Sequence, residues 1–158
     1  MARWHELELE APALVALARG YLDAHVHTTL ATLRRDGAPR ISGTEVVFAR
    51  GELWLGSMPG AVKARDLQRD PRYALHSGSV DPPDWTGDAK VAGCVEEILD
   101  DERRVAVLGA NAQGPSGPSH LFCLDVTELS VVRLDDARDR LIIESWHPGR
   151  GVTRLERR

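Results

Sequence analysis

The sequence predicts a mainly β protein with a few short helices, built as an antiparallel barrel. Two observations support this fold class. Seven or eight short apolar runs with strand character follow one another at close spacing. Turn dipeptides separate these runs, and Asp36-Gly37 and Arg50-Gly51 are the clearest of them. No repeat or linker interrupts the 158 residues, so we expect one domain over residues 1–158, with its barrel core over residues 25–146.

The first three expected strands form a meander, the clearest topology in the sequence. Glycine in each connecting turn accepts the positive φ that tight hairpins need. The expected strands cover residues 25–34, 39–48, 52–56, 73–77, 89–99, 121–126, 129–134 and 141–146. Two stretches rich in Pro, Gly and small polar residues, 80–88 and 110–119, are expected to be loops.

Three short helices are expected, over residues 12–19, 61–69 and 101–108. Pro12 is tolerated at the first position of a helix, and Gly20 follows the expected end of that helix. The second helix ends where Asp70 precedes Pro71, because a residue before proline is disfavoured in the helical region. Asp100 is expected to cap the third helix.

Composition and charge restrict the class of function. Lys and Arg total 20 against 24 Asp and Glu, and the signs are mixed along the chain. We therefore expect no nucleic acid and no membrane as partner. No apolar run approaches the ~20 residues of a membrane span, and the N-terminus lacks an apolar signal core. The expected setting is the cytoplasm, with Cys94 and Cys123 reduced and buried.

An anion site is indicated where the meander meets the second helix. Arg40 enters the second strand, and Ser42 shares its face because side chains alternate along a strand. Gly56 and Ser57 close the third strand, and Lys63 lies near the start of the next helix. Such donors suit a phosphate group. Alone, Arg40 fits a solvated strand end and Lys63 a helix surface; together they favour a phosphate site.

The segment His27–Pro71, which carries this set, resembles the flavin-binding split-barrel family of pyridoxamine 5'-phosphate oxidase. The resemblance covers residues 20–155 and implies an antiparallel split β-barrel that binds FMN, with Arg40 and Lys63 on the phosphate. The family's K-x-R-N-L-like helix motif reads K-A-R-D-L here, from Lys63 to Leu67. Asp66 replaces the commoner Asn, and it either adds a negative charge near the anion, pairs with a neighbouring arginine or faces solvent.

The C-terminus supplies a second part of the resemblance. A Trp on the family's last strand lies beside the flavin, which Trp146 matches; core packing is the alternative for this residue. An R-L-H-D-R-like ending contributes substrate and cofactor contacts in the family. Here Arg154-Leu155 matches its first half, while Glu156 and Arg157 replace the His and the Asp. This departure argues against pyridoxamine phosphate oxidase activity itself.

Two further residues are candidates for contacts with the flavin. Lys90, at the start of its strand, is a candidate for the ring or the ribityl chain, and His76 for the ring. His25 and His27 share a strand face, but no Cys, Asp or Glu lies beside them at ligand spacing, so no metal is expected. Rossmann, Walker and nucleophile-elbow motifs are absent from the sequence.

The resemblance implies a homodimer that holds FMN, or the related deazaflavin coenzyme, in a cleft at the subunit interface. The leading expectation is an oxidoreductase that acts on a small-molecule substrate, with the cofactor carrying the hydride or electron chemistry. No side-chain general base is indicated. The alternatives are a non-catalytic stress protein that sequesters flavin, and a haem-handling protein that would use His147, the last histidine of the chain.

Overall fold

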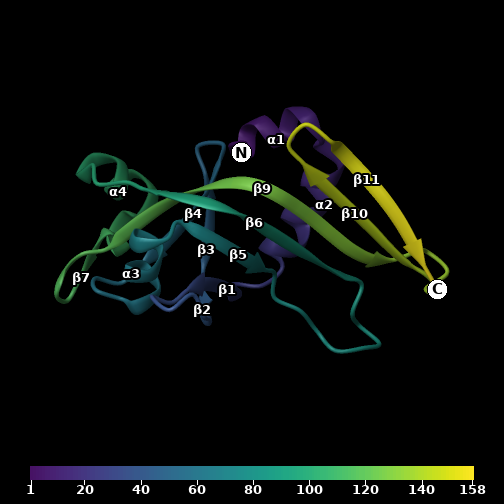
Figure 1. Ribbon diagram of the computed structural model, residues 1–158, viewed down its shortest axis with the longest axis horizontal. Helices are drawn as coiled ribbons and strands as arrows, with labels where there is room; N and C mark the ends of the chain where they lie inside the picture. The colour runs from purple at the N-terminus through teal and green to yellow at the C-terminus, as the bar shows by residue number, and fades with distance from the viewer.

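The computed structural model describes residues 1–158 and shows one long, curled antiparallel sheet with helices packed against it (Figure 1). The strands are β1 (Thr28–Leu33), β2 (Pro39–Thr44), β3 (Val46–Ala49), β4 (Glu52–Ser57), β5 (Arg72–His76), β6 (Gly87–Glu97), β7 (Gln113–Gly114), β8 (Gly117–Pro118), β9 (His120–Leu134), β10 (Leu141–His147) and β11 (Gly151–Arg157). The helices are α1 (Trp4–Glu10), α2 (Pro12–Asp23), α3 (Val62–Arg69) and α4 (Asp101–Leu108), with a 3₁₀ helix, η1 (Gly109–Ala112). Strands hold 46% of the residues, which confirms the predicted mainly β class.

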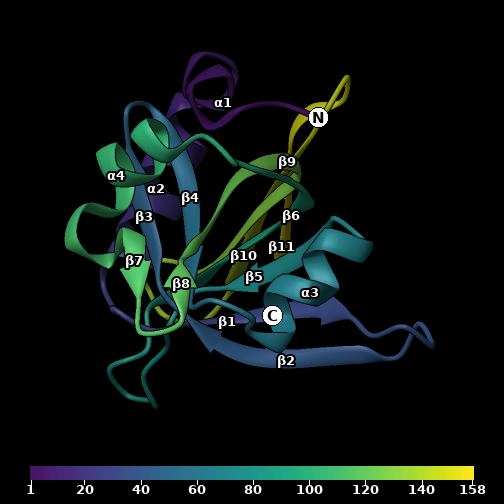
Figure 2. The ribbon, with the colours of Figure 1, turned by 90° about the vertical axis from the view of Figure 1, so that its left-hand side faces the viewer.

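The barrel closes at Glu45. The predicted strand over residues 39–48 is in fact two strands, because β2 pairs with β1 while β3 pairs with β4. Along the sheet the order runs β3-β4-β9-β6-β5-β1-β2, so β2 and β3 are its two ends. Glu45 alone separates these ends in the chain, and the sheet therefore curls until they meet (Figure 2).

β9 is the longest strand of the sheet and pairs with three other strands. Its first residues pair with β4, its last residues pair with β10, and β6 runs along most of its length. The two strands predicted over residues 121–126 and 129–134 are therefore one continuous strand. The register shifts at Gly93 of β6, where a Cβ atom would lie 1.9 Å from the carbonyl oxygen of Asp125. Only glycine fits at that position.

The three predicted helices are present, with small changes at their ends. α2 continues through Gly20 to Asp23, because one of its faces is buried against the sheet. α3 ends at Arg69, one residue before Asp70. Asp100 caps α4, and its carboxylate accepts a hydrogen bond of 2.7 Å from the backbone N–H of Arg103.

Three features of the structure were not expected from the sequence. α1 precedes the predicted first helix and buries Trp4 and Leu7. The stretch 110–119, expected to be a loop, contains most of η1 and the small β7–β8 hairpin. The C-terminal residues form β11, which extends the sheet beyond the barrel as an exposed edge strand.

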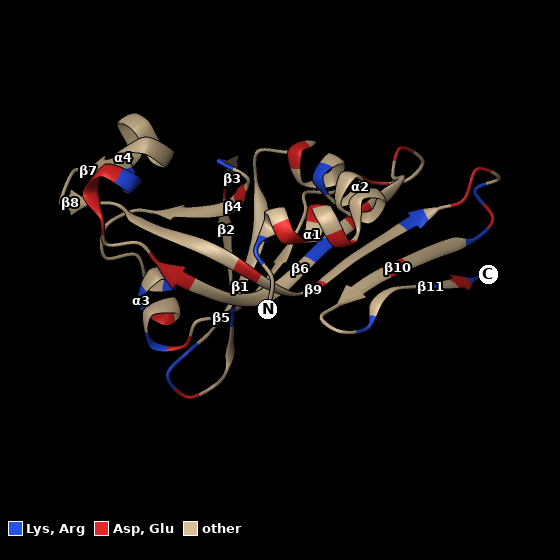
Figure 3. Ribbon diagram, turned by 90° about the horizontal axis from the view of Figure 1, so that it is seen from above, with Lys and Arg blue, Asp and Glu red and all other residues tan.

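The main core combines buried residues of the curled sheet with those of α1, α2 and α3. α1 packs against β4 and β9, and α2 packs against β6, β9 and β10. Trp146 of β10 belongs to this core. Lysines and arginines interleave with acidic residues over the whole molecule (Figure 3). Cys123 is buried, Cys94 is half-buried, and both are free thiols. None of the helices has the length and apolar character that a bilayer crossing requires.

Candidate functional site

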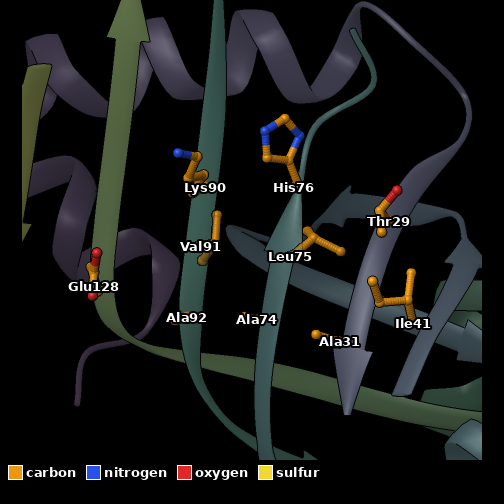
Figure 4. Close-up of a pocket in the computed structure, with 10 residues that line it drawn as sticks. All are labelled: Thr29, Ala31, Ile41, Ala74, Leu75, His76, Lys90, Val91, Ala92 and Glu128. Carbon is orange, nitrogen blue, oxygen red and sulfur yellow. The ribbon is translucent and has the colours of Figure 1, made fainter. Parts of the chain in front are cut away.

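Two hollows on the outside of the barrel adjoin each other. The first, with a volume of about 340 Å³, lies over the outer face of β1, β5 and β6 (Figure 4). The second, of about 510 Å³, lies between the β2–β3 bend, the end of β4 and the start of α3. Thr29 in the wall of the first is the cross-strand partner of Gly43 in the wall of the second. The two hollows therefore lie next to each other at this strand pair, and together they are called here the barrel groove.

The floor of the first hollow is a row of alanines. Ala31, Ala74 and Ala92 are successive cross-strand neighbours on β1, β5 and β6. Ile41 continues the row at one end and Glu128 at the other. Because the alanine side chains stop at Cβ, they leave a flat apolar surface, here called the alanine shelf. Such a surface suits the face of a planar ring.

A polar row borders the alanine shelf. Thr29, His76 and Lys90 are likewise cross-strand neighbours on β1, β5 and β6, and Figure 4 shows His76 and Lys90 side by side. The Nδ1–H of His76 donates to the carbonyl oxygen of Ser77 over 2.7 Å, which orients the ring. The exposed ammonium of Lys90 makes no hydrogen bond or ion pair within the chain, so its three donors are available to a ligand.

The second hollow holds two buried hydroxyls that have no hydrogen-bond partner. They are Thr44 Oγ1 at the end of β2 and Ser57 Oγ at the end of β4. A buried hydroxyl left without a partner costs about 1–3 kcal/mol. These two hydroxyls therefore fit a polar ligand group.

Lys63 supplies the positive charge in the second hollow. Its Nζ donates to the carbonyl oxygen of Gly43 over 2.7 Å, which links α3 to β2. Burial lowers the pKa of this ammonium, and the nearby carboxylate of Glu45 opposes the change only in part. Glu45 lines the same hollow, and His27 Nδ1 lies 3.8 Å from its carboxylate. The hollow thus combines one lysine, one carboxylate and one histidine.

Arg40 lines neither hollow. Its Nε donates to Oδ2 of the buried Asp66 over 2.6 Å, while Arg69 donates to Oδ1 over 2.9 Å. Thr32 adds a third hydrogen bond of 3.0 Å. Asp66 therefore pairs with a neighbouring arginine, one of the alternatives that the sequence left open, and also with Arg40. These contacts fasten β1 and β2 to α3, the helix that carries Lys63.

The remaining predicted site residues divide between the barrel groove and other places. Gly56, Ser57 and Lys63 line the second hollow, and Lys90 and His76 line the first.

Besides Arg40, three predicted site residues lie outside both hollows in this single chain. Ser42 is half-buried on the same face of β2 as Arg40. Trp146 is buried in the core, where its Nε1 donates to Glu10 Oε2 over 3.1 Å. Arg154 lies on the exposed strand β11 and donates to Glu156 over 2.9 Å.

The sequence did not point to several residues of the groove. The alanine shelf was missed because three separate strands contribute one small residue each. Glu45 was missed because it lies within a predicted strand rather than at a bend. The far wall of the second hollow comes from Leu108, Asn111 and Gln113, in a stretch expected to be partly a loop. Only the pattern of strand pairing reveals these neighbours.

Comparison with known families finds one match: the family described as pyridoxamine 5'-phosphate oxidase, over residues 15–133. No curated protein sequence matches the chain.

Comparison with solved structures finds many similar folds. One is a pyridoxamine 5'-phosphate oxidase-related, FMN binding protein from Nostoc punctiforme, with a TM-score of 0.65 and 16% identity, covering 91% of this chain and 94% of that chain. Campylobacter jejuni ChuZ gives a TM-score of 0.70 and 12% identity, covering 91% of this chain and 63% of that chain. General Stress Protein 26 from Bacillus anthracis gives 0.58 and 15%, covering 78% of this chain and 93% of that chain. These likenesses confirm the predicted split β-barrel fold.

Proposed function

The chain belongs to the pyridoxamine 5'-phosphate oxidase family, and we propose that it binds a flavin nucleotide, FMN or the deazaflavin coenzyme, along the barrel groove. We propose further that it is an oxidoreductase acting on a small molecule. The observation that supports cofactor binding most strongly is the contact between the two hollows at Thr29 and Gly43. A flat apolar shelf therefore adjoins a polar pocket that contains a lysine and two partnerless hydroxyls.

The shape of a flavin nucleotide matches this arrangement. Its planar ring would lie over the alanine shelf, and its phosphate would lie near Ser57 and Lys63. The linking chain would pass Gly43, whose missing side chain leaves the passage between the hollows open. A Cβ atom built on Gly43 meets no other atom within 4 Å, so a larger side chain there would project into free space.

The residues of the groove would bind and orient the cofactor rather than react with it. Lys63 would neutralise phosphate charge, and Ser57 would donate a hydrogen bond to a phosphate oxygen. The alanine shelf would exclude water from one face of the ring, and Lys90 would donate to a polar atom at its edge. When bound, the ring would supply the hydride or electron chemistry.

The proposal includes a homodimer. The alanine shelf is open on its outer side, and Ile41 beside it is 75% exposed. A second copy of the chain would cover both apolar surfaces and complete the cleft around the ring. Sedimentation of the purified protein would give the oligomeric state.

A cofactor titration with matched variants tests the proposed site. Purified protein is titrated with FMN and, separately, with the deazaflavin coenzyme, and cofactor fluorescence is followed. We expect saturable binding to at least one of them, weakened about 10-fold by Lys63→Met, as for a lost charge-assisted contact of about 1.4 kcal/mol. Arg65→Met is the matched control, because Arg65 is an exposed cation on the same helix outside both hollows.

Equal dissociation constants for Lys63→Met and Arg65→Met would show that the cofactor does not use the second hollow. Turnover separates an enzyme from a binding protein: an oxidoreductase reduces its bound cofactor with a nicotinamide donor and reoxidises it, whereas a sequestering protein does neither. A Soret band on addition of haemin, lost in His147→Ala, would instead support the haem-handling alternative.

A further inference from the structure

We propose that Glu45 makes the second hollow selective for a flavin-type cofactor whose phosphate is a singly charged diester, over one whose phosphate is a doubly charged monoester. This inference rests on the proposed cofactor site. It assigns a role in specificity to the residue that joins the two ends of the barrel sheet, and it bears on which coenzyme the protein uses.

The second hollow can balance one negative charge. A phosphate monoester carries about −1.5 to −2 charges near pH 7, because its second pKa is about 6. A phosphodiester carries a single charge at every pH above its first ionisation. The hollow contains one lysine, Lys63, which can neutralise one charge. Glu45 in the same lining repels any charge beyond that one, and its carboxylate lies 3.8 Å from His27 Nδ1, beyond hydrogen-bond distance.

A phosphate dianion would require a second cation beside Lys63. Arg40 is the second cation that the family resemblance assigns to the phosphate, but it lines neither hollow and its Nε is bound to Asp66. The oxygens of Asp66 also hold Arg69. Both arginines are thus held at Asp66, outside the lining of the second hollow, and Lys63 is the one lysine or arginine in that lining.

The second hollow extends beyond Ser57 and Lys63. The second hollow, about 510 Å³, exceeds the roughly 300 Å³ at which small-molecule pockets begin, so a phosphate group alone leaves much of it free. Its far wall carries the exposed side-chain amides of Asn111 and Gln113, which make no hydrogen bond within the chain. A diester has a second substituent, and these amides offer it donors and acceptors.

The test compares four ligands on the wild-type protein and on Glu45→Gln. Riboflavin has no phosphate, and FMN has a monoester. In the deazaflavin coenzyme the ribityl-linked phosphate is a diester. In FAD it is half of a pyrophosphate, where it is substituted on both sides and carries one charge as a diester does, while the adjoining adenylate phosphate carries a second charge; the two compounds are called here the diester ligands. Dissociation constants are measured by fluorescence titration at about pH 7.5 in low salt, where surface charges are least screened. Comparing FAD with the deazaflavin coenzyme shows which of the two sources of the diester the hollow accepts.

We expect the wild-type protein to bind at least one of the two diester ligands about 5-fold or more tightly than FMN. Glu45→Gln should tighten FMN about 5-fold, as for removal of one repulsion between partly exposed charges, and should leave riboflavin unchanged. Glu45→Lys should tighten FMN further. The tightening of FMN binding by Glu45→Gln should be smaller in about 0.5 M salt, because the Glu45 side chain is 64% exposed and salt screens exposed charges. Glu102→Gln is the control, since this exposed residue of α4 lies outside both hollows.

The inference is overturned if FMN binds the wild-type protein as tightly as both diester ligands do. It is also overturned if Glu45→Gln leaves FMN unchanged or tightens riboflavin equally. Failure of all four ligands to bind either protein would instead remove the proposed cofactor site, and this inference with it. The two failures are therefore distinguishable.

Discussion

Asp66 is a buried carboxylate that joins three elements of the fold. It lies in the helix motif that resembles a phosphate-binding sequence, yet it accepts hydrogen bonds from Arg40, Arg69 and Thr32. The sequence alone did not identify Arg40 as a partner of Asp66. Arg40 is 26 positions away and reaches Asp66 only through the packing of β2 on α3. At this scale, a residue's role depends on a contact distant in sequence.

Replacing Asp66 should destabilise the protein strongly. Asp66→Asn would leave two arginines beside a neutral amide, and we expect a loss of about 3 kcal/mol in the free energy of unfolding. This is the low end for a broken buried ion pair, because Arg40 and Arg69 are partly exposed. Urea denaturation measures the loss, with Asp84→Asn in the exposed stretch 81–84 as control. A loss no larger than the control's would contradict the structural role.

The same carboxylate should make stability depend on pH. Burial opposes ionisation of Asp66, but the hydrogen bonds from Arg69, Arg40 and Thr32 outweigh it and hold its pKa below the ordinary value. A pKa lower in the folded than in the unfolded state stabilises the fold above about pH 4, the unfolded pKa, and this stabilisation is lost as pH falls further. The gap in unfolding free energy between wild type and Asp66→Asn should therefore narrow below about pH 4.

Helices and tight turns were predictable from the sequence because their signals are local. Asp70-Pro71 ends α3, Asp100 caps α4, and the Arg50-Gly51 turn has positive φ at both residues, 54° and 77°. Strand boundaries were less predictable, since they depend on which partner a strand finds. β9 remains one strand because β6 pairs along most of it, and the predicted 39–48 strand divides because its halves find different partners.

Removal of the Asp100 cap should affect one element and little else. α4 has no fully buried residue, so its stability depends on local contacts such as this cap. We expect Asp100→Ala to cost about 1 kcal/mol locally and to speed amide hydrogen exchange in α4 about 5-fold. Exchange in β6 and β9 should be unchanged. Slower or unaltered exchange in α4 would show that the cap does not hold the helix.

At the scale of the whole molecule, the candidate site divides into a part that sequence could predict and a part that it could not. Gly56, Ser57 and Lys63 are close in the chain, so their proximity follows from one turn between a strand and a helix. The alanine shelf draws on three strands whose neighbourhood depends on the curl of the entire sheet. The junction of the two hollows at Thr29 and Gly43 depends on the same register.

The central claim, that one cofactor spans both hollows, is tested most directly by closing the passage between them. Gly43→Leu would place a branched side chain in that passage, where a Cβ atom meets nothing within 4 Å, so the fold should tolerate it. Gly20→Leu, at an equally open position in α2, is the matched control. The measurement is the dissociation constant of the tightest-binding of the four ligands for wild type and both variants, with thermal melting of each.

The proposed site predicts that Gly43→Leu weakens cofactor binding at least about 10-fold, or about 1.4 kcal/mol, while Gly20→Leu leaves it unchanged. Both variants should melt cooperatively, at temperatures close to that of the wild-type protein. Undiminished binding by a folded Gly43→Leu protein would contradict the claim, because no cofactor could then pass Gly43 from the alanine shelf to Lys63.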